Sequence, residues 1–346
     1  MRQTIKAGLL AFVLILGLVT LLAGYAGMQG GQDIGGTTQS QPAESQTQQT
    51  EQQTQMPTQQ TAPTEGPQRP TLPAPSFSIS SPYVFVYDMA DNRILFSKGD
   101  MDKHIPPASL TKLFTAYVAL QYLDPAAIIT VGEEVTWIDP DSSVAHISKG
   151  QRLSVEMCVE GMMLQSGNDA AYALAVAAGR TIQGNPNLAA RVALSVFVGK
   201  MNDEAMALGL EDTHFANPDG IDAPGHYSSM NDLIAISALA LDIPMVRKYC
   251  AMAQDRVTYA SGQTVTWKNT NELLHPKSPF YCEDACGLKT GSTSGAGKCL
   301  ISAFNQTKDY LLIGVLGGKG ENDRYRDTLK LYNYYTDLPA KIKNAA

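Results

Sequence analysis

The chain has 346 residues, of which 44% are hydrophobic and 17% are charged, and its formal net charge at pH 7 is -7. This length accommodates one large or two ordinary domains, and the hydrophobic content is that of a folded protein diluted by a polar tract. The acidic balance and the lack of any lysine or arginine block argue against a surface for polyanions, so we expect no nucleic-acid partner.

The first segment, residues 1–26, has the pattern of an export signal. Arg2 and Lys6 precede an uncharged apolar run over residues 7–26, a pattern typical of chains that enter the export machinery. The run approaches the ~20 residues that span a bilayer as a helix, yet Gly24-Tyr25-Ala26 offers small residues to a signal peptidase. A cleaved signal peptide and a membrane anchor both stay open. Either one predicts an extracytoplasmic protein, on the outer face of the cytoplasmic membrane or secreted into the cell wall.

Residues 27–76 are dominated by Gln, Thr, Pro, Ser and Gly and contain almost no aliphatic side chains. Such a tract buries too little apolar surface to offset the entropy of ordering it. We therefore predict a disordered linker, which would hold the folded part away from the membrane if an anchor is retained.

The folded domain is predicted over residues 77–340, which is enough for one large core. Alternating and apolar runs predict strands at residues 83–87, 93–96, 287–291, 299–304 and 310–316. Helical periodicity predicts helices at residues 110–123, 156–164, 168–180, 189–208, 230–241 and 324–335. Strands at both ends with helices between them predict an α/β (α+β) fold, in which one sheet carries an inserted helical lobe. A cleft between sheet and lobe is a natural place for a site.

The segment Ser109-Leu110-Thr111-Lys112 places a hydroxyl and an amine three residues apart at the start of an apolar helix. Residues with this spacing share one helix face, so their side chains can touch. A serine nucleophile needs a base within hydrogen-bond reach, and this pair supplies both groups. Taken alone, the segment is equally typical of a helix N-cap serine followed by a solvated lysine.

Two further segments change the meaning of that pair. Ser166-Gly167-Asn168 stands at a break between two predicted helices, and Lys289-Thr290-Gly291 ends a predicted strand. By itself the first is typical of a helix cap and the second of a strand end. Together and in this order, the three segments are those of penicillin-binding proteins and related β-lactamases, with Gly167 where a central Asp is usual.

The resemblance extends beyond these motifs, over roughly residues 80–335. The chain resembles the serine-type D-alanyl-D-alanine carboxypeptidases, the low-molecular-weight penicillin-binding proteins. The segments that carry the likeness are residues 107–117, 164–171, 214–220, 226–228 and 287–291. It implies a β-lactamase/transpeptidase-like fold with an antiparallel sheet, and removal of the terminal D-alanine from peptidoglycan stem peptides that end in D-Ala-D-Ala. It also implies inhibition by β-lactams, and no cofactor.

The resemblance assigns roles to the first two motifs. Ser109 would attack the carbonyl of the D-Ala-D-Ala bond and form an acyl-enzyme. Lys112 would take its proton, which requires a neutral amine, and burial and a second cation such as Lys289 both favour that form. Ser166 would pass a proton to the leaving amine, while Asn168 would hold Lys112 and the substrate backbone.

The third motif is expected to bind the substrate. Lys289 and Thr290 would hold its terminal carboxylate, which explains cleavage one residue from the end. The backbone N–H groups of Ser109 and Ser292 would form the oxyanion hole, a kind of site often worth several kcal/mol in the transition state. Gly291 would leave room for the substrate to pair along the strand edge.

Other activities share these motifs. A class A β-lactamase also needs a glutamate that activates water, but Glu204 and Glu211 lack the Glu-Xaa-Xaa-Leu-Asn setting of that residue and are expected to lie on a helix face and at its end. A DD-transpeptidase or endopeptidase differs only in the acceptor, and we favour water. A non-catalytic penicillin-binding sensor would have no need of intact catalytic residues, which here are Ser109, Lys112, Ser166 and Lys289.

Histidines and cysteines add little chemistry to this picture. The five histidines show no pairwise metal spacing, so no metal site is expected. Cys282 and Cys286 lie close enough for a small-loop disulfide, and a reduced pair is the alternative left open. Cys158 and Cys299 are expected to be buried small hydrophobes.

The C-terminal end departs from many members of the family that this chain resembles. Those proteins carry a small C-terminal β-domain that ends in an amphipathic membrane-binding helix. Here residues 341–346 are too short to anchor anything. Membrane attachment is therefore expected only through residues 7–26, which favours the anchor over the cleaved signal.

Overall fold

The computed structural model describes residues 74–306 and 309–336. The predicted export segment over residues 1–26 and almost all of the predicted linker over residues 27–76 lie outside them, as does the stretch 341–346. No helix within the described residues combines the length and the hydropathy needed to cross a bilayer. The described residues include 77–306 and 309–336 of the predicted folded domain.

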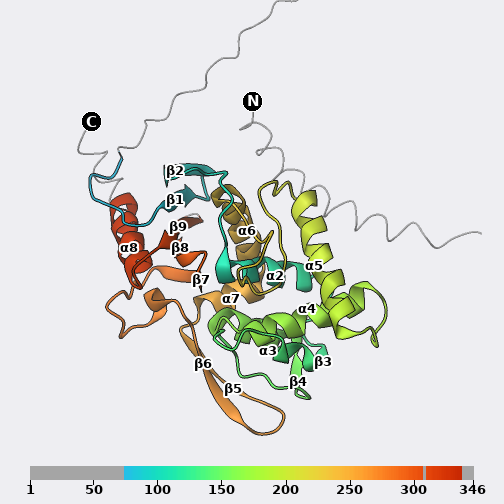
Figure 1. Ribbon diagram of the computed structural model, residues 1–346. Helices are drawn as coiled ribbons and strands as arrows, with labels where there is room; N and C mark the ends of the chain where they lie inside the picture. Colours follow the sequence, from blue (N-terminus) through green and yellow to red (C-terminus); the bar gives the residue numbers. More distant parts are fainter. Residues whose placement is uncertain (1–73, 307–308, 337–346) are drawn as a thin grey trace, which may run out of the picture. The chain divides into compact units, whose positions relative to one another are not determined.

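One antiparallel sheet of five strands forms one side of this domain (Figure 1). Its strands, in spatial order, are β2 (Arg93–Lys98), β1 (Tyr83–Asp88), β9 (Tyr310–Gly318), β8 (Gly297–Asn305) and β7 (Ala285–Thr293). Every neighbouring pair is antiparallel. Because β1 pairs with β9, the sheet is built from both ends of the domain, which confirms the predicted architecture.

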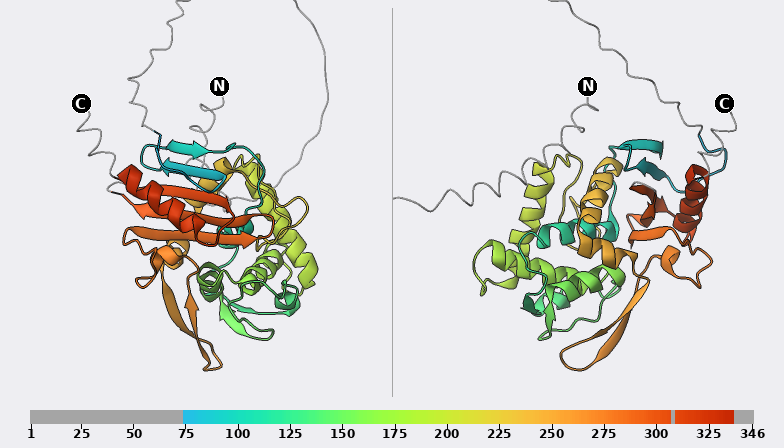
Figure 2. Two further views of the ribbon diagram at one scale, coloured as in Figure 1. Left: turned by 60° about the vertical axis from the view of Figure 1, so that its left-hand side comes forward. Right: turned by 180° about the vertical axis from the view of Figure 1, so that it is seen from behind.

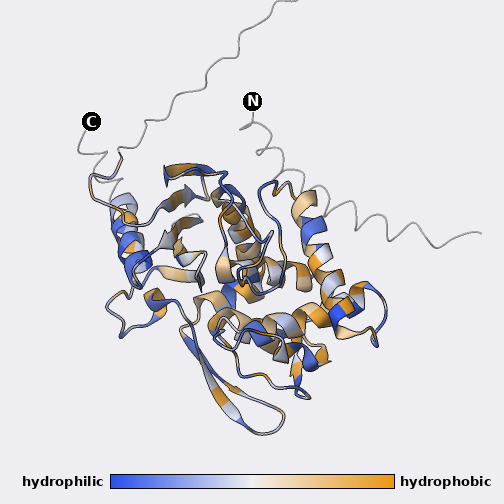
Figure 3. Ribbon diagram, in the orientation of Figure 1, coloured by the Kyte–Doolittle hydropathy of each residue, from blue (hydrophilic) through white to orange (hydrophobic). Residues whose placement is uncertain are grey.

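The inner strands of the sheet are covered on both faces. β8 and β9 are buried over most of their length, so their sequences are apolar runs rather than alternating patterns. Helix α8 (Asp323–Thr336) lies on one face, and helices of the lobe lie on the other (Figure 2). Figure 3 shows α8 mainly in hydrophilic colours, as expected for a helix that turns one face to solvent.

The helical lobe is inserted between β2 and β7. Its helices are η1 (Ala108–Leu110), α2 (Thr111–Ala119), η2 (Glu133–Thr136), α3 (Val155–Leu164), α4 (Asn168–Ile182), α5 (Ala190–Ala207), α6 (Met230–Asp242), α7 (Pro244–Ala251) and η3 (Glu272–Leu274). The central helix is α2, which packs against α3, α4, α5 and α6 and buries Leu113 and Phe114 completely. Any side chain on its first turn is therefore held in a close-packed interior.

The structure differs from the sequence prediction in the lobe. The helix predicted over residues 110–123 begins as the 3-10 turn η1 and ends at Ala119, because the next residues close turns such as the Gln121 N–H to Val118 carbonyl bond. The short pair β3 (Ile128–Thr130) and β4 (Arg152–Ser154) is not predicted by the sequence. Strands of three residues are too short for a period to be recognised.

A second feature missed by the sequence is the hairpin of β5 (Gln254–Thr258) and β6 (Thr264–Lys268), which projects from the lobe in Figure 1. Most of its side chains are exposed, but Trp267 is completely buried. Helix α7 is also unpredicted; it follows α6 after a break at Ile243, and Pro244 occupies its first turn, where proline is favoured.

Candidate active site

The structure brings Ser109 and Lys112 into contact. Ser109 lies in η1 and Lys112 in the first turn of α2, with 2.8 Å between Ser109 Oγ and Lys112 Nζ. Lys112 is completely buried. Its Nζ also donates a 2.6 Å hydrogen bond to the backbone carbonyl of Asp219. The solvated lysine that the segment alone also allows is therefore wrong, because this amine lies inside the protein beside a hydroxyl.

Burial governs the charge of this lysine. It lowers the pKa of Lys112 to about 8, although the carboxylates of Asp219 and Asp169 oppose the shift. The pKa of Lys289 is held well below its usual value, first by burial and then by the charge of Lys112. Desolvation penalises a charged amine, and two neighbouring cations penalise each other. Burial is thus the cause that favours the neutral form of Lys112. The predicted effect of Lys289 is not among the causes of that shift; instead, the charge of Lys112 lowers the pKa of Lys289.

The backbone at the nucleophile packs tightly against β7. Ala108, just before Ser109, has a φ of 50°, which is uncommon for a residue with a side chain. A Cβ added to Gly291 would lie 2.9 Å from the Ala108 Cβ and 3.1 Å from the Ser109 nitrogen. Such contacts leave no space for a side chain. Gly291 therefore allows β7 to approach η1, in addition to any role in substrate pairing.

The second motif lies in the break between α3 and α4. Ser166 is 4% exposed and has a φ of 56°, and Asn168 begins α4 and is 3% exposed. A Cβ added to Gly167 would lie 2.7 Å from the Asp169 Oδ1 and 2.8 Å from the Ala145 Cβ. The space that a central aspartate would need is filled, which explains the glycine in this motif.

The third motif lies within edge strand β7. Lys289 and Thr290 are 1% and 5% exposed, and Lys289 Nζ donates to the carbonyl of Thr290 at 3.1 Å. The hydroxyl of Thr290 is 2.5 Å from that of Thr270, whose backbone N–H donates to the carbonyl of Leu164 at the end of α3. Thr270 thus connects the third motif to the helix that leads into the second.

Comparison with known proteins shows the family of the chain. A family model described as D-alanyl-D-alanine carboxypeptidase, peptidase S11, matches residues 68–320, well over half of the chain. The chain belongs to the D-alanyl-D-alanine carboxypeptidase family.

Relatives within the family agree with this assignment. The D-alanyl-D-alanine carboxypeptidase DacC of Escherichia coli strain K12 is 32% identical over 284 residues, 79% of this chain and 65% of that protein. The D-alanyl-D-alanine carboxypeptidase of Streptomyces sp. strain K15 is 36% identical over 235 residues, 65% of this chain and 77% of that protein. The chain covers 59% to 65% of the length of DacC and of the DacD proteins from Salmonella typhimurium and Escherichia coli.

A solved structure shares the fold. The crystal structure of the Streptomyces K15 DD-transpeptidase superposes with a TM-score of 0.68 and 29% sequence identity, over 77% of this chain and all of that one. The β-lactamase/transpeptidase-like fold that the sequence resemblance implies is therefore confirmed.

Two residues near the motifs have no role assigned to them from the sequence. Asp169 is buried and accepts 2.8 Å hydrogen bonds from the backbone N–H groups of Ala145 and Ile147. These bonds fix the loop that contains residues 145–147 against the start of α4. The signal was an aspartate in the first turn of a helix, where a negative charge is favoured. Arg324 donates to the Ser292 hydroxyl at 3.0 Å. Its place on α8 gives no sequence signal for that contact.

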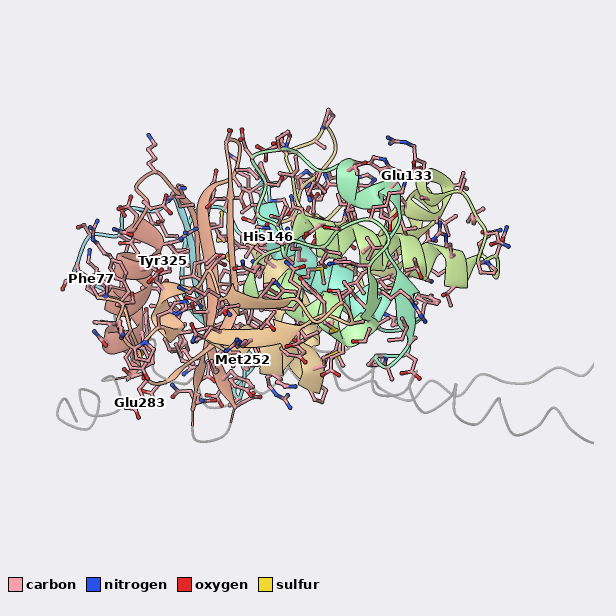
Figure 4. All side chains as sticks on the ribbon, turned by 90° about the horizontal axis from the view of Figure 1, so that it is seen from below. Phe77, Glu133, His146, Met252, Glu283 and Tyr325 are labelled. Atoms are coloured by element: carbon pink, nitrogen blue, oxygen red, sulfur yellow. The ribbon has the colours of Figure 1, made fainter. Side chains whose placement is uncertain are left out.

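Side chains of α8 and of the β5–β6 hairpin contact segments that lie next to the second and third motifs. Figure 4 shows Tyr325 of α8 on the sheet side and His146 on the loop that Asp169 holds. Tyr325 donates to the carbonyl of Thr270 at 3.0 Å. The carbonyl of Ala145 accepts from Trp267 Nε1 at 2.9 Å, so the β5–β6 hairpin braces the same loop.

The cysteines and Glu204 follow alternatives that the sequence allows. Cys282 and Cys286 are free thiols, which is the reduced alternative, and Cys158 and Cys299 are buried as expected. Glu204 pairs with Lys200 on α5 at 2.8 Å, the helix-face role expected of it. No group of three or more His, Cys, Asp and Glu among the described residues could hold a metal ion.

Proposed function

We propose that the chain is a serine-type D-Ala-D-Ala carboxypeptidase that removes the terminal D-alanine from peptidoglycan stem peptides and is acylated by penicillin. The observation that carries the proposal is the 2.8 Å contact between Ser109 Oγ and a completely buried Lys112 amine. A buried amine with a lowered pKa is able to accept a proton, and a hydroxyl beside it is an activated nucleophile.

Acylation begins when Ser109 Oγ attacks the carbonyl carbon of the scissile bond while its proton passes to Lys112 Nζ. The backbone N–H groups of Ser109 and Ser292 stabilise the oxyanion that forms on the carbonyl oxygen. Collapse of this intermediate breaks the C–N bond, and the proton held by Lys112 passes through the Ser166 hydroxyl to the departing amine of D-alanine, which leaves Lys112 neutral again. The product at this stage is an ester between Ser109 and the shortened peptide.

Water then completes the reaction. It attacks the ester carbonyl while one of its protons passes to Lys112 Nζ. The bond between the acyl carbon and Ser109 Oγ then breaks, the proton returns from Lys112 to Ser109 Oγ, and the shortened peptide leaves as a carboxylic acid. Asn168 holds Lys112 and the substrate backbone throughout. Lys289 and Thr290 bind the terminal carboxylate of the substrate before cleavage. The negative charge of that carboxylate favours the protonated form of Lys289, so the two groups form a charge-assisted hydrogen bond.

Release of D-alanine from diacetyl-Lys-D-Ala-D-Ala tests the proposal, with labelling by fluorescent penicillin as a second readout. We expect wild-type protein to show both activities and Ser109→Ala to show neither. Persistence of either activity in Ser109→Ala would contradict the assigned nucleophile. Labelling without D-alanine release would leave a penicillin-binding sensor or a transpeptidase.

A transpeptidase is the second candidate, because the superposed Streptomyces K15 structure is named a DD-transpeptidase. The two activities differ in whether water or an amine accepts the acyl group from Ser109. Adding glycylglycine as acceptor to the same assay separates them: a carboxypeptidase gives the shortened acid, whereas a transpeptidase gives the amide product at the expense of the acid.

The place of action is part of the proposal. The charged start and apolar run over residues 7–26 favour export, and the proposed substrate, a cell-wall peptide, lies outside the cytoplasm. We infer a protein at the outer face of the membrane if this segment is retained, or in the cell wall if it is removed. The N-terminal residue of the mature protein, read from the purified natural product, distinguishes the two.

A further inference from the structure

The segment over residues 217–225, between α5 and α6, is a short loop with its own internal brace. The side chain of Asn217 accepts a hydrogen bond from the Gly220 N–H and donates one to the carbonyl of Ile221, both at 2.8 Å. A single amide that bonds both sides of a turn fixes its shape. This segment, here called the 217–225 loop, is therefore braced internally over residues 217–221.

One side of the 217–225 loop contacts the nucleophile and its base. The carbonyl of Asp219 accepts the 2.6 Å hydrogen bond from Lys112. Gly220 has a φ of 90°, and a Cβ added there would lie 1.9 Å from the carbonyl oxygen of Ala108. Only glycine allows this approach. The loop is thus in direct contact with the residue before Ser109.

The other side of the loop contacts the end of β7. The carboxylate of Asp222 accepts a 2.6 Å hydrogen bond from the Thr293 hydroxyl and a 2.7 Å bond from the Gly295 N–H. The Thr293 hydroxyl in turn accepts the N–H of Ala296 at 3.0 Å, which closes the turn between β7 and β8. Hydrogen bonds to an ionised acceptor are roughly twice as strong as neutral ones.

We propose that Asp222 is a positioning residue that sets the end of β7, and with it the backbone N–H of Ser292, relative to Ser109. The inference rests on the proposed function, in which these two residues supply the N–H groups of the oxyanion hole. The two halves of that hole come from elements far apart in sequence. The 217–225 loop touches both, through Gly220 at η1 and through Asp222 at Thr293.

The strand needs such a contact because β7 is at the edge of the sheet. On one side it pairs with β8, and from the α8 side Arg324 holds the Ser292 hydroxyl at 3.0 Å. Asp222 holds the strand end from the lobe. Loss of Asp222 therefore leaves β7 folded and lets its end shift. An oxyanion hole is sensitive to such a shift, because its donors act over about 2.7–3.1 Å.

The test compares Asp222→Ala and Asp222→Asn with Asp124→Ala as the matched control. Asp124 is also exposed and also accepts a backbone N–H, that of Ala126 at 2.8 Å, but it lies in the turn after α2. For Asp222→Ala we expect kcat to fall about tenfold, a fraction of the loss seen when an oxyanion donor is removed. KM for the diacetylated peptide should stay within about twofold. Asp222→Asn should be intermediate, because its one oxygen replaces one of the two acceptors.

A transition-state analogue separates positioning from general damage. A peptide boronic acid forms a tetrahedral adduct with a serine nucleophile, so its affinity should fall with kcat, while the melting temperature matches that of Asp124→Ala. Wild-type kcat in Asp222→Ala, or a loss of kcat with unchanged boronate affinity, would overturn the proposal. Failure of the proposed function looks different: wild-type protein itself then releases no D-alanine and is not labelled by penicillin.

Discussion

The side-chain nitrogen of Lys112 is bonded to the backbone carbonyl of Asp219 at 2.6 Å. A carbonyl is an acceptor without a formal charge, so it orients the amine without the full stabilisation that a directly bonded carboxylate would give to the ammonium form. One N–H of a neutral amine can donate to this carbonyl while its single lone pair faces Ser109 Oγ, 2.8 Å away. The base is thus oriented by a residue more than a hundred positions further along the chain.

The charge of Lys112 should control the pH dependence of acylation. Its pKa is about 8, and the neutral form is the base, so the reactive fraction rises with pH. We expect the rate of penicillin acylation to increase about tenfold per pH unit below pH 8 and to level above it. Stopped-flow measurement with fluorescent penicillin between pH 6 and 9.5 checks this. A flat profile over that range would assign the proton transfer to another group.

Lys112→Arg provides the control for that profile. Arginine keeps the positive charge at all these pH values and cannot accept the proton. Acylation should fall by at least about a thousandfold, as when a general base is removed from a serine enzyme, and the residual rate should lose its rise with pH. An arginine variant that keeps the wild-type profile would exclude Lys112 as the base.

Lys289→Ala should affect substrates according to their terminal charge. A charge-assisted hydrogen bond contributes about 1.5–3 kcal/mol, so kcat/KM for a peptide ending in a carboxylate should fall roughly 10- to 100-fold. The corresponding peptide amide should lose much less. Lys298→Ala is the control, because Lys298 lies on the neighbouring strand β8, outside the motif, where it forms an ion pair with Glu321. Equal losses for acid and amide would mean that Lys289 does not recognise the carboxylate.

The fold and the site differ in how far the sequence predicts them. Strands β7 and β8 and helices such as α4 are visible because each has an apolar run or period of its own. Ser109 and Lys112 are found because their spacing places them on one helix face. These are local signals, which a single sequence carries in full.

Contacts between distant segments carry no such signal. Thr270 reaches Thr290, and Arg324 reaches Ser292, only because the chain brings a loop and a helix beside β7. The glycine at position 167 reads as a departure from the motif until Ala145 and Asp169 are seen to fill the space. What the sequence leaves out is therefore the set of residues that hold the motif side chains in place.

His226 should make the protein less stable in acid. Its Nδ1 accepts the N–H of Ala216 at 3.0 Å, so its neutral ring carries the proton on Nε2, 2.9 Å from the Thr111 hydroxyl. Burial, and then the charge of His214, lower its pKa from 6.5 to about 4. Between these values the unfolded chain binds a proton that the folded chain does not, so stability falls as the pH drops from 6.5 towards 4.

Urea unfolding of wild type and His226→Gln at pH 7 and pH 5 measures this effect. The wild type should lose more stability between the two pH values than the glutamine variant does. His104→Gln is the control, because that side chain is half exposed and contacts Asp212 rather than Thr111. The same loss in wild type and His226→Gln would assign the acid sensitivity to other groups.

Glu160 should make the protein less stable as the pH rises. It lies on α3, is 5% exposed, and its Oε1 has no hydrogen-bond partner among the described residues. Burial, followed by the hydrogen bond and charge of Asp255, raises its pKa from 4.5 to about 8. The folded chain therefore keeps a proton that the unfolded chain releases, and this contribution to stability is lost as the pH rises from 4.5 towards 8.

Glu160→Gln mimics the protonated side chain and should remove this dependence. We expect the variant to resemble wild type near pH 5 and to be more stable than wild type at pH 8.5, by urea unfolding. Glu156→Gln is the matched variant one turn earlier on α3, where the carboxylate is half exposed and accepts the hydroxyl of Tyr249 at 2.6 Å. Loss of the Glu156 carboxylate should lower the free energy of unfolding slightly at both pH values, since an exposed pair contributes at most about 1 kcal/mol. If Glu160→Gln shifts stability equally at pH 5 and 8.5, the buried carboxyl is not protonated in the folded protein.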